Sequence, residues 1–288
     1  MMDYSKTLRN NNKICSRSSG RDQNLQFTSG LSLRFVLSGS ERYDLGRRNL
    51  SIYPDSFLIL NRGTQYSSSA DPDMPVQSFS INFDEKFLQE FKERYQFTGQ
   101  QLFGRGQQVK QNQEFDETIY PFTGDMWYNV QHLKKHLDNG IHDESLINEY
   151  LNHCLINYFR IYQEEVCKKA EKLRFLNAGT KNDIIRRLNI AKDYLYSNYN
   201  QNITLDELAD HACLSVNHLL RTFKQAFGVS PHQFLIQLRL QRAQLLLKST
   251  DYSITEVVGL VGFECPSSFI RLFKTHYKIT PLKYRQSA

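Results

Sequence analysis

Two sets of side chains in the 288-residue chain have the chemistry needed to bind a nucleic acid. Each set has a polar residue, an arginine and a lysine at the same helical spacing, with an aliphatic residue at its edge. Arginine can grip guanine or phosphate, asparagine can read adenine, lysine can neutralise phosphate, and an aliphatic group can pack on a thymine methyl. The first set consists of Asn217, Leu220, Arg221 and Lys224, and the second of Ser267, Ile270, Arg271 and Lys274.

A repeated stretch of sequence makes the two sets equivalent. FKQAFGVSPHQF begins at Phe223, and FKTHYKITPLKY begins at Phe273. Phe223 and Phe273 each belong to an apolar stripe at helical spacing, which predicts a helix with one buried face. A solvated helix could carry arginine and lysine by chance, but two faces with the same order beside the same stripe favour a shared binding role. The stripes are Leu219, Phe223 and Phe227, and then Phe269, Phe273 and Tyr277.

A shorter helix is predicted before each of these two helices. Thr204-Leu-Asp-Glu207 and Ser253-Ile-Thr-Glu256 have the spacing of a capping box, in which the hydroxyl and the glutamate satisfy free backbone N–H groups. Helix, tight turn and helix therefore occur twice, which predicts two helix-turn-helix units. Another helix is expected over 184–195, and a long one from residue 231 joins the units.

The excess positive charge is confined to the same region. Residues 181–288 contain 14 Lys and Arg against 8 Asp and Glu, whereas residues 1–180 contain 22 of each kind. Basic charge concentrated in one domain favours a polyanionic partner, although a solvated basic face without a partner is an alternative.

The first part of the chain has a different pattern, in which strands are expected before helices. Short runs typical of strands fill residues 25–83, namely LSLRFVLS, RRNLSIY, FLILN and VQSFSINF, and turn clusters separate them. This pattern predicts a sandwich or small barrel. Helical spacing starts after Asp84 and returns at about 125–139 and 143–172. The segment 173–182 resembles a linker.

Several classes of site and protein are not expected. No apolar run approaches the roughly 18 residues of a membrane span. The five cysteines are scattered and form no CxxC pair, which favours a reducing cytoplasm over a disulfide framework or a zinc site. His132 and His136 have the spacing of a ligand pair on a helix, but no third ligand is evident. We therefore expect no metal, no cofactor and no catalytic residue.

From about residue 183 onward the sequence resembles the AraC/XylS family of transcription regulators. LDELADHACLSVNHLLRTFKQAFGVSPHQFLIQLRLQRAQLLL resembles the first half of the family's DNA-binding domain, and ITEVVGLVGFECPSSFIRLFKTHYKITPLKYR resembles the second. The resemblance implies that both longer helices enter successive major-groove segments, with contacts from the two sets named above. For the front half the resemblance is looser, and implies a cupin-like sensor barrel followed by dimerising helices. The helices over 125–172 are expected to supply a homodimer interface, and capping of the barrel is the alternative.

Three positions depart from the family's pattern, all in the second unit. Cys265 stands where an aspartate usually caps the final recognition helix, a loss of roughly 1 kcal/mol. Lys278 stands where glycine usually ends that helix in a left-handed conformation, whereas the first unit keeps Gly228. Val258 replaces a usual alanine at a tight helix contact.

The sequence thus predicts an α+β protein: a cupin-like regulatory domain over 1–172, a linker over 173–182, and an all-α domain with two helix-turn-helix units over 183–288. The expected function is cytoplasmic, non-enzymatic regulation of transcription. The expected partners are double-stranded promoter DNA, a small-molecule effector, a second copy of the chain and, for an activator, RNA polymerase, but no membrane. The alternatives are an enzyme domain fused to this DNA-binding domain, such as a repair methyltransferase, and an effector-independent DNA binder.

Overall fold

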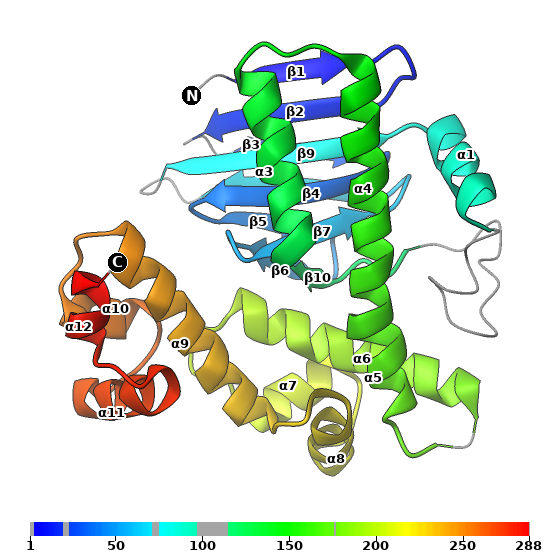
Figure 1. Ribbon diagram of the computed structural model, residues 1–288. Coiled ribbons are helices and arrows are strands. Elements are labelled where there is room, and N and C mark those ends of the chain that lie inside the picture. Colours follow the sequence, from blue (N-terminus) through cyan, green and yellow to red (C-terminus); the bar gives the residue numbers. More distant parts are fainter. Residues whose placement is uncertain (1–2, 20–22, 71–74, 97–114, 176, 288) are drawn as a thin grey trace. The chain divides into compact units, whose positions relative to one another are not determined.

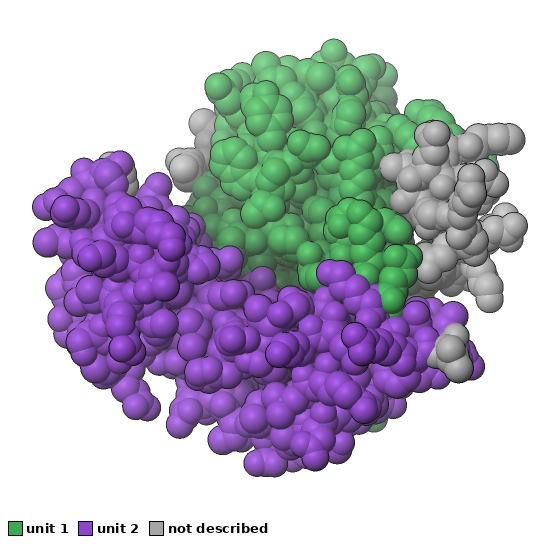
Figure 2. Space-filling view, turned by 60° about the horizontal axis from the view of Figure 1, so that its bottom comes forward, with its two compact units in different colours: residues 1–171 green, residues 172–288 purple. Residues whose placement is uncertain are grey.

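The computed structural model describes residues 3–19, 23–70, 75–175 without 97–114, and 177–287. The chain divides into two compact units, residues 1–171 and 172–288 (Figure 2). The first unit contains all the described strands, and the second is helical.

Two antiparallel sheets form the first unit. The larger has the strand order β1-β2-β9-β4-β7-β10, and the smaller has the order β3-β8-β5-β6. The larger sheet consists of β1 (Tyr4–Thr7), β2 (Lys13–Ser19), β9 (Val76–Phe83), β4 (Leu31–Ser38), β7 (Ser56–Leu60) and β10 (Ile119–Pro121). The smaller consists of β3 (Gln23–Thr28), β8 (Gln65–Ala70), β5 (Glu41–Asp44) and β6 (Asn49–Ile52).

The sheet region begins earlier than the sequence pattern suggests, at Tyr4 rather than near residue 25. β2 pairs with β9 along its whole length, with Ile14 opposite Ile81. Its alternate residues Lys13 and Arg17 are exposed. Because charged residues occupy one face of this strand, its hydrophobicity is too low to mark it as a strand.

Helices cover one face of the larger sheet. Figure 1 shows α3 (Gly124–Asp138) and α4 (Glu144–Tyr162) crossing it. Between them and the sheet lie aromatic rings: Phe35 packs against Phe122 at 4.8 Å, and Tyr120 packs against Tyr158 at 5.4 Å between centroids. α1 (Glu85–Gln96) follows β9, and α4 continues through a π-helical turn (Gln163–Cys167) into α5 (Lys168–Glu171).

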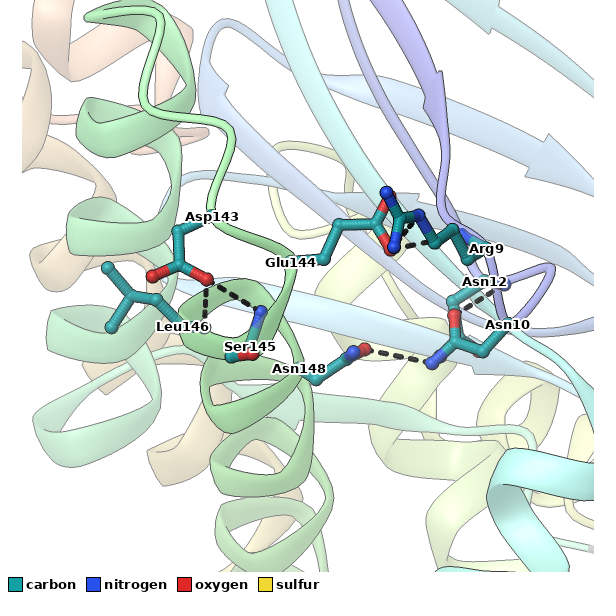
Figure 3. Close-up of polar contacts among 8 residues, drawn as sticks. All are labelled: Arg9, Asn10, Asn12, Asp143, Glu144, Ser145, Leu146 and Asn148. Carbon is teal, nitrogen blue, oxygen red and sulfur yellow. Dashed lines mark hydrogen bonds and ion pairs between the residues drawn. The ribbon is translucent and has the colours of Figure 1, made fainter.

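The turn between β1 and β2 holds the start of α4 (Figure 3). Asn10 donates a hydrogen bond of 2.9 Å to the side chain of Asn148, and Arg9 contacts the carboxylate of Glu144. Asp143 caps the helix by accepting from the backbone N–H of Ser145 at 2.9 Å. These contacts tie the first hairpin to the covering helices.

Seven helices make up the described part of the second unit: α6 (Ala178–Ser197), α7 (Leu205–His211), α8 (Val216–Phe227), α9 (Pro231–Ser249), α10 (Ile254–Leu260), α11 (Pro266–Tyr277) and α12 (Pro281–Gln286). α6 begins inside the segment 173–182, because the side chain of Asn177 caps it by accepting from Gly179 N at 2.7 Å. Its predicted inward residues are buried: Ile184, Leu188, Ala191 and Leu195.

Candidate nucleic-acid interface

Two helix-turn-helix units are present, α7–α8 and α10–α11, and their turns start alike. Leu214 N donates to Ala209 O at 2.9 Å, and Phe263 N donates to Val258 O at 3.0 Å. Both bonds close a Schellman motif, in which the residue after the helix is left-handed. That residue is Cys213 with φ 51° in the first unit and Gly262 with φ 83° in the second.

The helix starts only partly match the expected capping boxes. Ser253 and Glu256 form the complete reciprocal box. Thr204 accepts from Glu207 N at 3.2 Å, but the Glu207 carboxylate accepts a hydrogen bond from Tyr194 OH instead of the Thr204 backbone N–H. The predicted box at this position is therefore wrong in its second half, because a tyrosine hydroxyl from α6 competes for the glutamate.

The repeated stretches have a structural role that explains their aromatic residues. Phe223 of α8 and Phe273 of α11 are fully buried. Phe234 in the next helix meets Phe223 edge-on at 5.6 Å, and Tyr284 meets Phe273 in the same way at 5.6 Å. Each repeat thus packs the second helix of its unit onto the helix that follows it.

Packing of the aromatic faces leaves the predicted contact residues outward. Seven of the eight are exposed, among them Ile270 at 40%, and Leu220 is half-buried. The four cations among them have no ion-pair partner within the described parts of the chain: Arg221, Lys224, Arg271 and Lys274. By contrast, Arg187 of α6 binds Asp183 at 2.8 Å. These outward faces therefore carry positive charge that no ion pair among the described residues neutralises.

The end signals of α11 are those that the sequence suggests. Cys265 occupies the N-cap position, and its side chain caps no backbone N–H. Its sulfur lies 3.0 Å from Ser267 Oγ, and hydrogen bonds from Ser267 and Ser268 lower the pKa of the thiol to about 7. Lys278 ends the helix with φ 66°, the conformation that Gly228 adopts at the end of α8 with φ 78°.

Sequence patterns gave no sign of a clamp around Arg239. This α9 side chain donates two hydrogen bonds of 2.7 Å, to the carbonyl oxygens of Tyr199 and Gln201. Its guanidinium also lies 5.7 Å from the ring centroid of Phe263 in the second turn. Because the acceptors are backbone atoms, no residue type marks them in the sequence.

The histidine pair has other partners. The His132 ring packs on Tyr128 at 4.0 Å, and His136 Nδ1 lies 3.3 Å from Tyr150 OH. Within the described residues, no three His, Cys, Asp or Glu side chains come together as a metal site would require.

The comparisons with known proteins cover both units. A model described as "AraC-like ligand binding domain" matches residues 17–153, and one described as "Helix-turn-helix domain" matches residues 208–287. The chain belongs to the AraC/XylS family of transcriptional regulators. The "Raffinose operon transcriptional regulatory protein RafR" of Pediococcus pentosaceus is 28% identical over 233 residues, 80% of this chain and 75% of that protein.

Other relatives match a smaller share of the chain. The "HTH-type transcriptional regulator MtrA" of Neisseria gonorrhoeae is 40% identical over 82 residues, 28% of this chain and 27% of that protein. An uncharacterised HTH-type regulator of Haemophilus influenzae is 33% identical over 102 residues, 35% of this chain and 34% of that protein. The chain thus matches about a third or less of these two relatives' own lengths. Neither matching family model describes a catalytic domain. Among the helices of the described residues, none has the length and hydropathy of a membrane span.

Proposed function

We propose that this AraC/XylS-family chain is a sequence-specific regulator of transcription whose helices α8 and α11 read successive major-groove segments of promoter DNA. The observation that carries the proposal is the pair of outward faces with the same order of polar residue, arginine and lysine. Their four cations lack ion-pair partners in the described chain. Phosphate and base edges are the chemistry that such exposed donors bind.

Arginine substitutions test the two faces separately. Arg221→Ala and Arg271→Ala are compared on a duplex selected from random DNA and on a scrambled duplex. If each arginine reads a base, each change costs about 1–3 kcal/mol and relaxes the preference in one segment only. If one grips only phosphate, binding weakens alike on every sequence. We expect the smaller loss from Arg271→Ala, because α11 lacks a side-chain cap.

The matched control is Arg186→Ala, which removes an exposed arginine of α6 from the same unit. It changes net charge equally and should leave sequence preference intact. Silent Arg221 and Arg271 substitutions, in proteins that remain folded, would show that the recognition faces are elsewhere. Affinity should also fall steeply with salt, because phosphate neutralisation releases counterions.

A second copy of the chain is the proposed partner of α3 and α4. These helices bury Met126, Val130 and Leu133 against the sheet, yet Trp127 and Tyr128 stay 46% and 60% exposed on the outer side. A groove of about 480 Å³ beside them is lined by residues of both helices. Trp127→Glu should reduce the mass measured by light scattering from dimer to monomer. A monomeric wild-type protein at micromolar concentration would exclude this interface.

The proposal has four further parts. They are control by an effector, a cytoplasmic location, the absence of catalysis and, for an activator, contact with RNA polymerase. The ligand-binding family model over 17–153 supports an effector, and scattered cysteines without a CxxC pair suit a reducing compartment. Selection of bound DNA with and without a metabolite extract tests effector control. Effector-insensitive binding would instead support the effector-independent alternative, and turnover of a metabolite would support the enzyme fusion.

A further inference from the structure

A polar cavity lies between the two sheets of the first unit. It has a volume of about 320 Å³ and is lined by residues of β2, β9 and β4 on one side and of β3, β8 and β5 on the other. This volume is at the lower end of the roughly 300–1,000 Å³ of small-molecule sites. Only a compact ligand fits.

An arginine is held in place at this cavity. Arg34 of β4 donates to Tyr66 OH at 2.7 Å and to Ser32 Oγ at 3.3 Å, and its guanidinium lies 5.1 Å from the centroid of the Tyr66 ring. A guanidinium has five N–H donors, and these two bonds leave three without a protein acceptor among the described residues. Because the planar group is already oriented, it can bind an acidic group with little further loss of side-chain entropy.

Two more cations line the same cavity. Lys13 and Arg17 alternate along β2, so both point to the side that faces the cavity. Neither forms an ion pair with any described residue. The lining includes a single carboxylate, Glu41, which already accepts a hydrogen bond of 2.8 Å from Tyr43 OH. Three cations against one carboxylate favour a negatively charged ligand.

The remaining lining indicates the body of the ligand. Ser78, Ser80 and Asn82 of β9 present hydroxyl and amide groups, and Glu41 has a second oxygen that can accept a hydroxyl proton. Opposite them, the rings of Phe27 and Tyr66 pack 5.7 Å apart. Hydroxyl groups of a ligand can form hydrogen bonds with the polar side chains of β9, whereas a long hydrocarbon chain would leave these side chains unpaired.

We propose that this cavity binds a small hydroxylated metabolite through a carboxylate or phosphate group held by Arg34, Arg17 and Lys13. The proposal rests on the proposed function only in taking this ligand as the effector. Carboxylate and phosphate share the recognition chemistry, since both accept paired hydrogen bonds from a guanidinium.

The test measures thermal unfolding of the full chain without DNA, because a ligand that binds the folded state raises Tm. The probes are an extract of metabolites below about 1 kDa, split by anion exchange into anionic and neutral fractions, and the matched set gluconate, glucose 6-phosphate and glucose. The anionic fraction should raise Tm, and gluconate and glucose 6-phosphate separate the two acidic groups. Arg34→Gln should raise the Kd of a stabilising anion about 10- to 100-fold.

Two further variants keep the test independent of folding. Arg17→Gln changes an exposed residue with no described partner, and should also weaken the anion. Arg42→Gln is the matched control, because Arg42 lies on β5 between two lining residues and is not part of the lining. Its response should equal that of the wild type.

The proposal would be overturned if only the neutral fraction raised Tm, or if neither fraction did. It would also be overturned if anions stabilised Arg34→Gln and Arg17→Gln as much as the wild type. DNA binding is measured separately on the same proteins. A wild-type protein that binds DNA but is not stabilised by anions would reject only the cavity proposal. A wild-type protein that is stabilised by anions but binds no DNA would reject only the proposed function.

Discussion

Gly262, at the turn between α10 and α11, is the position where a single methyl group should cost most. A Cβ atom there would lie 2.6 Å from the carbonyl oxygen of Asn200 and 2.8 Å from its carbonyl carbon. Both are backbone atoms, so no side-chain rotation relieves the contact. The residue also has φ 83°, in the left-handed region.

The two effects can be given approximate sizes. A left-handed conformation costs a residue other than glycine roughly 1–2 kcal/mol. Forcing an additional methyl group into a packed site costs about 1–3 kcal/mol. Cys213 has φ 51° at the equivalent turn, so the first cost is tolerated there. Gly262→Ala should therefore destabilise the second helix-turn-helix unit by about 2–5 kcal/mol, with the larger part from the contact with Asn200.

Hydrogen exchange of peptides from α10 and α11 is the suitable assay, because it reports local opening in a chain of two units whose global unfolding need not be two-state. The matched control is Gly259→Ala. Gly259 lies within α10, and a Cβ there meets nothing within 4 Å, so the change should stabilise by up to about 1 kcal/mol. Equal protection in Gly262→Ala and wild type would refute the reasoning.

Two further predictions concern the ends of α11. Lys278→Gly should stabilise the protein by up to about 1 kcal/mol in thermal unfolding, because glycine adopts the left-handed conformation at φ 66° without strain. Gly228→Lys, the reverse change at the end of α8, should destabilise the protein. A destabilising Lys278→Gly or a stabilising Gly228→Lys would contradict this account. The pKa of Cys265, lowered to about 7, places more thiolate at neutral pH than an ordinary cysteine has. Because the thiolate is the reactive form and increases as pH rises, alkylation of Cys265 by iodoacetamide should be half-maximal near pH 7. A midpoint near the usual value of about 8.5 would contradict this prediction.

Helices α8 and α11 could be predicted because local signals agree there. The stripe of Leu219, Phe223 and Phe227 fixes which face is buried, and the opposite face follows from helical spacing. The strands β4 and β9 have equally clear patterns. Strand β2 could not be found, because Lys13 and Arg17 face the cavity and give it the polarity of a loop.

Long-range contacts account for what the sequence pattern does not show. The competition of Tyr194 for Glu207 joins residues of two helices, and only the folded chain brings them together. The cavity takes its lining from six strands, so no local motif represents it. The roles of the eight predicted contact residues remain predictions, since their exposure is consistent with DNA binding but also with an ordinary solvated surface.

The clamp around Arg239 has a mechanical consequence for reading DNA. The two recognition helices are connected along the chain by α9 and, independently, through the loop of Tyr199 and Gln201, which Arg239 binds while its guanidinium lies near Phe263. With Gly262 set against Asn200, these contacts link the two helix-turn-helix units by a second path besides α9. We therefore expect this second link to restrict the distance between α8 and α11. Binding sites in which the two segments are one base pair further apart should then bind poorly. Arg239→Ala removes the contacts that Arg239 makes, so it should raise the affinity for the lengthened site relative to the normal one. The base preference within each half of the site should stay the same.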